Sequence, residues 1–81
     1  MSISGKGVNL AYLVGKCLLL DLLNGANMTQ RDLAIKLGVT EQQVNKYVRD
    51  RQRMSIQTAK NVAHILNCSM EDLYEWTVVG D

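Results

Sequence analysis

A tight turn at Gly38 between two short amphipathic segments constrains the fold of this chain most strongly. Apolar residues recur three and four positions apart in both segments, as they do on the buried face of a helix. These residues are Leu33, Ala34 and Leu37 before the turn and Val44, Tyr47 and Val48 after it. Ala34 is small where two helices would cross, and the glycine adopts a left-handed turn freely. Residues 29–49 therefore have the pattern of a helix-turn-helix.

Hydroxyl side chains mark the starts of four helical segments, which include the two on either side of this turn. Three of them lie three positions before an acidic or amide side chain, which is the spacing of a capping box, and the fourth is a simpler cap. They are Thr29, Thr40 and Ser69, followed by Ser55 as the simpler case. With the apolar periodicity and the absence of proline, they predict helices at about 8–24, 30–37, 41–49, 56–66 and 70–76. We therefore expect an all-α, compact five-helix fold in a single domain over residues 1–81, with strand character only at residues 77–79.

The segment from Val8 to Leu23 is the most apolar part of the chain. Asn9, Lys16 and Asp21 interrupt it, and it is shorter than the roughly 18–20 clean apolar residues of a membrane-spanning helix, so we expect no membrane partner. Its apolar side chains would surround a helix, whereas a surface helix needs one stripe. We expect this helix to bury more than one face, either among the other helices or partly in a homodimer contact.

The outer face of the second short segment has the chemistry of a DNA reader. At about 100° per residue, the positions between its apolar residues point outward. They carry amides, which pair bidentately with adenine, and long cations, which reach guanine or phosphate. The candidate base-reading residues there and in the first turn are Thr40, Glu41, Gln42, Gln43, Asn45, Lys46 and Arg49. A solvated polar face is the alternative for these positions, and Glu41 has a second alternative as a cap of its own helix.

The distribution of charge supports this interpretation better than the total does. The chain has a formal net charge of +1, but residues 31–60 hold seven basic and three acidic side chains, a net charge of +4. Everything else sums to −3, with Glu71, Asp72, Glu75 and Asp81 near the end. A basic face opposite an acidic end suits a protein that binds double-stranded DNA with one side only. The small total predicts modest non-specific affinity and dependence on dimerisation.

Residues 28–76 resemble the Cro/C1 repressor family, also called the XRE family. The positions that carry the resemblance are Thr29-Gln30, Leu33-Ala34, Leu37-Gly38-Val39-Thr40, Val44, Tyr47, Ser55, Ala63, Ile65-Leu66, Ser69 and Asp72-Leu73. The resemblance implies a lambda-repressor-like fold. It also implies that Gln30 braces a DNA phosphate and that Thr40, Glu41, Gln42, Asn45 and Lys46 read bases. The sequence departs from the family in three places: the family usually has a Glu where Val48 stands, a Gly near Asp50 and a Pro near Met54.

Backbone phosphates are the second expected class of DNA contact. At the first turn of a helix, the Gln30 amide and the free N–H groups can meet a phosphate. The candidate phosphate-binding residues are Thr29, Gln30, Arg51 and Arg53. The two arginines have the alternative of a charge run paired with Asp50. Asp50 tolerates a left-handed turn, so the fold survives the replacement of glycine.

Two classes of function remain. The first is a sequence-specific transcriptional regulator, a phage or bacterial Cro/C1-like repressor that binds a palindromic operator as a homodimer in the cytoplasm, on the nucleoid. The second is a protein-interaction module, antitoxin-like or anti-repressor, that keeps the fold. We expect dimerisation through residues 69–81, with Trp76, Val78 and Val79 at the interface.

Enzymatic chemistry is not expected from this sequence. No nucleophile, acid–base pair or metal-ligand set converges in it, so we expect no catalytic residue, metal, cofactor or small-molecule ligand. His64 lacks companion ligands and is interpreted as a partly exposed structural residue. Cys17 and Cys68 are interpreted as reduced thiols that act as small core hydrophobes.

Overall fold

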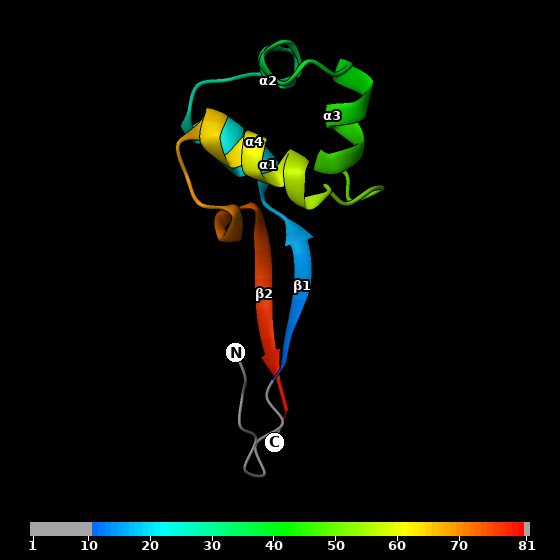
Figure 1. Cartoon of the computed structure of the whole chain (residues 1–81), viewed down its shortest axis with the longest axis vertical. Helices are drawn as coiled ribbons and strands as arrows, with labels where there is room; N and C mark the ends of the chain where they lie inside the picture. Colours follow the sequence, from blue (N-terminus) through cyan, green and yellow to red (C-terminus); the bar gives the residue numbers. More distant parts are fainter. Residues whose placement is uncertain (1–10, 81) are drawn as a thin grey trace.

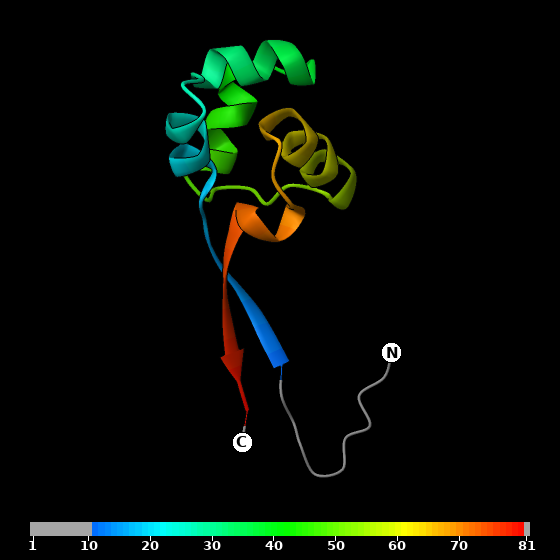
Figure 2. The same cartoon turned by 90° about the vertical axis from the view of Figure 1, so that its left-hand side faces the viewer.

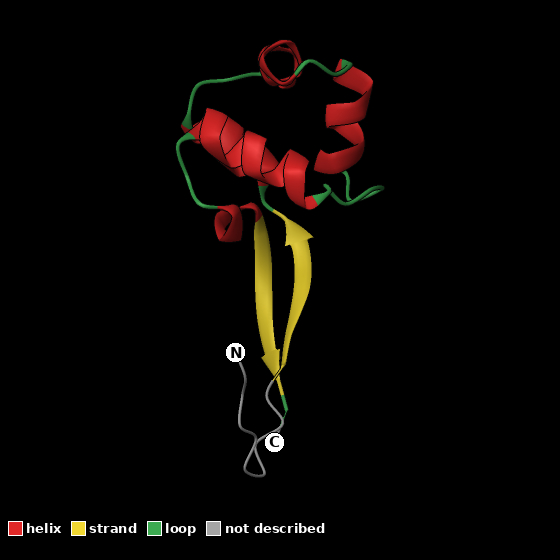
Figure 3. Cartoon of the chain, viewed as in Figure 1, coloured by secondary structure: helices red, strands yellow, loops and turns green. Residues whose placement is uncertain are grey.

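The computed structural model of the chain describes residues 11–80. Within this range, four α-helices form a body from which two strands project as an arm (Figure 1, Figure 3). The elements in chain order are β1 (Ala11–Cys17), α1 (Leu19–Gly25), α2 (Gln30–Leu37), α3 (Glu41–Val48), α4 (Ile56–Leu66), the 3-10 helix η1 (Met70–Leu73) and β2 (Tyr74–Val79). The two ends of the described chain thus lie together in the arm, away from the helices.

The expected all-α fold of five helices is wrong at both ends of the chain. Residues 11–17 form β1 instead of a helix, and positions 8–10 of the expected first helix lie outside the described residues. At the other end, a single 3-10 turn replaces the fifth helix, and residues 74–79 form β2. An apolar segment without a single-sided pattern is compatible with either a helix or a strand, so periodicity could not identify β1. Each strand also takes its backbone hydrogen bonds from a partner far along the chain, which local patterns do not show.

The first α-helix buries less than its sequence suggested. α1 buries Leu19 and Leu23 but leaves Leu20 exposed, so it presents one face to the core rather than several. Ala11, Tyr12, Leu13, Val14 and Cys17 of that segment belong to β1. None of the helices among residues 11–80 has the length and apolar character needed to cross a bilayer.

The three middle helices agree with their predicted bounds to within one residue, because local hydrogen bonds define their starts. The Thr29 hydroxyl accepts from the Asp32 N–H at 3.0 Å, and the Asp32 carboxylate accepts from the Thr29 N–H at 3.0 Å, which completes the predicted capping box. The Thr40 and Ser55 hydroxyls accept from the Gln43 and Thr58 N–H groups and so cap α3 and α4. The capping box predicted at Thr40 is formed only in this half, because the Gln43 side chain bonds Gln52 instead. Gly38 closes α2 in the left-handed conformation, with φ of 79°. The predicted turn between α2 and α3 is confirmed.

One apolar core joins all the helices to the base of the arm. The largest fully buried side chains come from five elements: Leu19, Leu23, Leu33, Val44, Val62 and Leu73. Burying such a side chain stabilises the fold by about 1.5–3 kcal/mol relative to leaving it in water. Ala34, at 3% exposure, lies where α2 packs against its neighbours, as its size predicted. The core therefore fixes α3 against α2 and leaves the outer face of α3 free.

The arm is an antiparallel pair whose side chains are mostly exposed. Tyr12 pairs with Val78 and Val14 with Trp76, so these four side chains share one face of the ribbon. The ribbon twists as it leaves the helices (Figure 2). An isolated two-stranded ribbon is marginally stable in water at best. The outer part of the arm consequently depends on the helical body or on a partner for its stability.

Candidate nucleic-acid interface

α3 presents a polar outer face, as its sequence predicted. Val44 and Tyr47 are buried, and the side chains that point away from them are exposed. The exposed residues are Thr40, Glu41, Gln42, Lys46 and Arg49, whereas Gln43 and Asn45 are half-buried. Glu41 lies in the first turn, where a carboxylate is favoured by the helix dipole. The outer face of α3 therefore presents the Gln42 amide and the Lys46 cation, and the Arg49 cation follows directly after the helix.

Two amide bridges connect the half-buried residues of α3 to neighbouring segments. The Asn45 Nδ2 donates to the Gln30 Oε1 at 3.1 Å, which ties α3 to the first residue of α2. The Gln43 Nε2 donates to the Gln52 Oε1 at 3.0 Å, which ties α3 to the loop that follows it. Sequence reasoning missed Gln52, because no local pattern marks an amide in a loop as the partner of a helix nine positions away. Both bridges orient amides at the edge of the α3 outer face.

The start of α2 adjoins the same edge. The Gln30 side chain is half-buried and lies against α3 through its bond to Asn45. Thr29 is exposed, and its hydroxyl caps the helix. Hydrogen bonding from the Thr29 N–H, with a smaller contribution from its hydroxyl, lowers the pKa of Asp32 below its ordinary value. Asp32 is therefore ionised at neutral pH and stabilises the N-terminal end of α2.

The exposed cations form a second part of the candidate interface. Lys46 belongs to α3, Arg49 is the C-cap residue directly after it, and Arg51 and Arg53 lie in the loop that follows. All four side chains are exposed. This loop lies between the end of α3 and the start of α4, next to the base of the arm (Figure 1). Positive charge thus continues from the outer face of α3 toward the arm.

Asp50 accommodates the left-handed turn that ends α3. Its φ is 59°, and the Arg51 N–H donates to the Lys46 carbonyl at 2.9 Å, which closes the turn. The expectation that aspartate tolerates this conformation is confirmed. The Asp50 carboxylate also accepts a hydrogen bond from the Cys17 N–H, a contact that links the turn to β1.

The arm carries the candidate self-association surface. Trp76 is 47% exposed, Val78 51% and Val79 38%, so the three residues expected at an interface are available for one. The Trp76 Nε1 donates to the Glu71 carbonyl at 3.1 Å, which anchors the indole beside η1. Tyr12, 69% exposed, lies on the same face as Trp76 and Val78, whereas Val79 lies on the opposite face. Tyr12 was not predicted, because its segment was interpreted as a helix.

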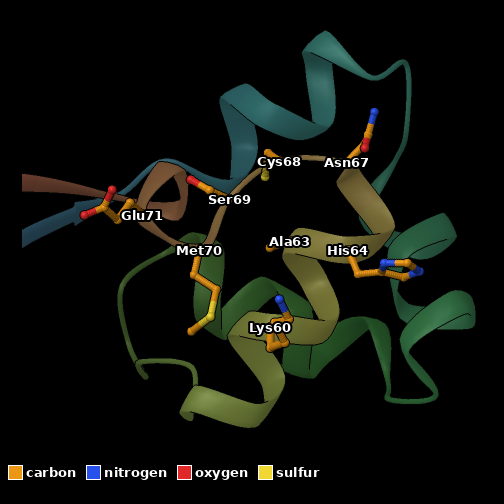
Figure 4. Close-up of a pocket in the computed structure, with 8 residues that line it drawn as sticks. All are labelled: Lys60, Ala63, His64, Asn67, Cys68, Ser69, Met70 and Glu71. Carbon is orange, nitrogen blue, oxygen red and sulfur yellow. The ribbon is translucent and has the colours of Figure 1, made fainter.

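His64 and Cys68 lie away from the candidate DNA-contacting residues. Figure 4 shows a hollow between α4 and η1 that includes His64 and Cys68 among its lining residues. His64 is exposed, and no group of three or more potential metal ligands occurs among residues 11–80. Both cysteines are free thiols, and burial raises the pKa of each. The hollow contains none of the predicted DNA-contacting residues.

Two comparisons with known proteins agree with this geometry. A model of the Cro/C1-type helix-turn-helix DNA-binding domain matches residues 19–78, which span all four α-helices of the described chain and most of β2. The chain is also similar to the SPbeta prophage-derived uncharacterized HTH-type transcriptional regulator YopS of Bacillus subtilis (strain 168). The two are 39% identical over 66 residues, which cover 80% of this chain and 89% of that protein.

Proposed function

The chain belongs to the Cro/C1-type helix-turn-helix family of DNA-binding domains, and on that premise we propose that it is a sequence-specific transcriptional regulator. In this proposal it acts as a phage or bacterial repressor, in the cytoplasm on the nucleoid, and binds a palindromic operator as a homodimer. The observation that carries the proposal is the polar surface of α3 and of its C-cap residue. Gln42, Lys46 and the capping Arg49 are exposed, while Val44 and Tyr47 hold the helix to the core. Double-stranded DNA is the partner that this face fits.

Base reading in this proposal comes from the exposed side chains of α3 and from its C-cap residue, Arg49. Gln42 can pair bidentately with adenine, and Lys46 and Arg49 can donate to the O6 and N7 acceptors of guanine. Glu41 and Thr40 lie at the N-terminal end of the helix, the part that contacts base edges in helix-turn-helix proteins. Gln43 also contributes to base reading, and its hydrogen bond to Gln52 fixes the orientation of its side-chain amide.

Phosphate binding comes from the start of α2 and the loop after α3. Because the Gln30 Oε1 accepts from Asn45, the Gln30 Nε2 is left to donate to a phosphate oxygen. Asn45 then acts through Gln30 in addition to, or instead of, reading a base. Thr29, Arg51 and Arg53 flank this contact and add hydroxyl and guanidinium donors.

Dimerisation in this proposal uses the arm. Each base contact contributes only about 1–3 kcal/mol of discrimination, so one short recognition helix discriminates too weakly for an operator. A two-fold axis through the arms would present two copies of α3 to successive major grooves, about 34–36 Å apart. Trp76, Val78 and Tyr12 supply an apolar face for such a contact.

The test is selection of bound sites from a random duplex pool, followed by binding titrations on the enriched site. We expect a palindromic site, and Gln42→Ala or Lys46→Ala should weaken it by roughly 1–3 kcal/mol and relax selectivity at one position. Lys60→Ala is the control, because it removes an exposed charge from α4 without changing α3. Unchanged affinity and selectivity in both α3 variants would contradict base reading.

The alternative function gives a different result in the same experiment. A protein-interaction module would enrich no site, and its weak binding to random duplex would lack the steep decrease with salt that counterion release produces. A titration from low to physiological salt therefore separates the two classes of function.

A further inference from the structure

One carboxylate holds the base of the arm to the end of α3. The strand register is irregular between Val14 and Cys17. There the Cys17 N–H donates to both carboxylate oxygens of Asp50, with N···O distances of 3.2 and 3.1 Å. The two residues are 33 positions apart in the chain, so the contact is purely tertiary. One N–H shared between the two carboxylate oxygens is a three-centre hydrogen bond, and it links β1 directly to the turn after α3.

A second hydrogen bond holds the other strand to the same loop. Tyr74 pairs with Cys17 across the ribbon, and its hydroxyl accepts from the Met54 N–H at 3.2 Å in buried surroundings. Burial raises the pKa of the Tyr74 hydroxyl, which is therefore neutral at physiological pH. Both strands are thus attached, at their bases, to the segment 50–54 that follows α3.

Asp50 transmits the position of α3 because it belongs to the helix end. Its N–H donates to the Tyr47 carbonyl at 3.1 Å, and the following N–H reaches back to Lys46. This closure leaves the Asp50 side chain little freedom to move independently of the helix. Glycine would adopt the φ of 59° with less strain, but it has no carboxylate to bond Cys17. The Asp50 carboxylate therefore has a role that closing the turn does not require, which is to accept the hydrogen bond from the Cys17 N–H.

From these contacts we infer that Asp50 and Tyr74 are positioning residues that fix the orientation of α3 relative to the arm, and so select the half-site spacing that the dimer accepts. The inference rests on the proposed function, in which the arms meet at the two-fold axis. A rotation of α3 relative to the arm would occur in both protomers, so it would change the distance and the angle between the two recognition helices of the dimer. Operator spacing in helix-turn-helix dimers follows from that geometry.

The experiment compares spacing preference in matched variants. After site selection with the unmodified protein, palindromes that differ by one base pair at the centre are titrated, together with a single half-site duplex. Asp50→Gly keeps the left-handed turn and removes the carboxylate, whereas Asp50→Asn keeps one acceptor oxygen. Hydrogen exchange of the Cys17 amide reports in each variant whether the contact is present, independently of DNA.

We expect the unmodified protein and Asp50→Asn to lose affinity on the order of tenfold at the wrong spacing, comparable to the loss of one base contact. Asp50→Gly should exchange the Cys17 amide faster, bind the half-site normally and discriminate spacings less than about threefold. If Asp50→Gly does not fold, Tyr74→Phe replaces it under the same binding criteria, with hydrogen exchange followed at the Met54 amide, whose acceptor this substitution removes.

Three results would overturn the inference. An unchanged spacing profile in Asp50→Gly would show that the contact does not control geometry, while the proposed function would stand. Lost half-site affinity would show that Asp50 acts on α3 itself. Failure of the unmodified protein to enrich two-fold symmetric sites would refute the dimeric function, and the inference with it.

Discussion

The bridge between Asn45 and Gln30 gives the sharpest quantitative test of the candidate interface. Asn45 was predicted to read a base, yet it is half-buried and its Nδ2 donates to the Gln30 Oε1 at 3.1 Å. If it orients the Gln30 amide toward a phosphate, Asn45→Ala removes one neutral hydrogen bond, worth about 0.5–1.5 kcal/mol. DNA affinity should then decrease by about 2- to 12-fold. Because phosphates carry no sequence information, specific and random duplexes should be affected alike.

A double-mutant cycle with Gln30→Ala distinguishes positioning from base reading. Once Gln30 is removed, Asn45→Ala should cost no more than the additivity error of about 0.3–0.5 kcal/mol, because the residue has nothing left to orient. Fluorescence anisotropy titrations at one fixed salt concentration measure all four proteins on the selected site and on random duplex. Asn61→Ala is the control, since it truncates an exposed asparagine on α4.

Additive losses in the cycle would refute the positioning role. A loss confined to one base position would restore the base-reading role of Asn45, which predicts a larger effect of about 1–3 kcal/mol at that position.

Three further predictions concern stability and assembly. Tyr74→Phe should lower the free energy of unfolding by about 1–3 kcal/mol in urea titrations, because it leaves the buried Met54 N–H without its acceptor, while Tyr12→Phe at an exposed position should have little effect. The pKa of Asp32 is lowered in the folded protein, so the carboxylate stabilises the fold above its unfolded pKa, and this effect is lost as the pH falls through its folded pKa. The difference in free energy of unfolding between Asp32→Asn and the unmodified protein should therefore disappear as the pH falls from the unfolded to the folded pKa of Asp32. Trp76→Ala should reduce self-association in sedimentation velocity more than Ile35→Ala, an exposed apolar control on α2, and equal effects would place the interface elsewhere.

The outer face of α3 was largely predictable, but its fine structure was not. The inward direction of Val44 and Tyr47 follows from helical periodicity, and the outward direction of Gln42 and Lys46 follows with it. Periodicity gives a direction for each side chain and says nothing of its partner on another element. The bond from Asn45 to Gln30 and the bond from Gln43 to Gln52 therefore emerged only once α2, α3 and the loop were packed together.

The sequence by itself determined the helix-turn-helix, because its determinants are local. The capping box at Thr29 and the left-handed turn at Gly38 involve atoms within a few residues of each other, so composition and spacing specify them. Only the tertiary structure decided that residues 11–17 and 74–79 form an arm, since strands require partners that local patterns do not identify. It likewise gave Asp50 its contact with Cys17, because a hydrogen bond across 33 positions exists only after the core has brought α3 and β1 together.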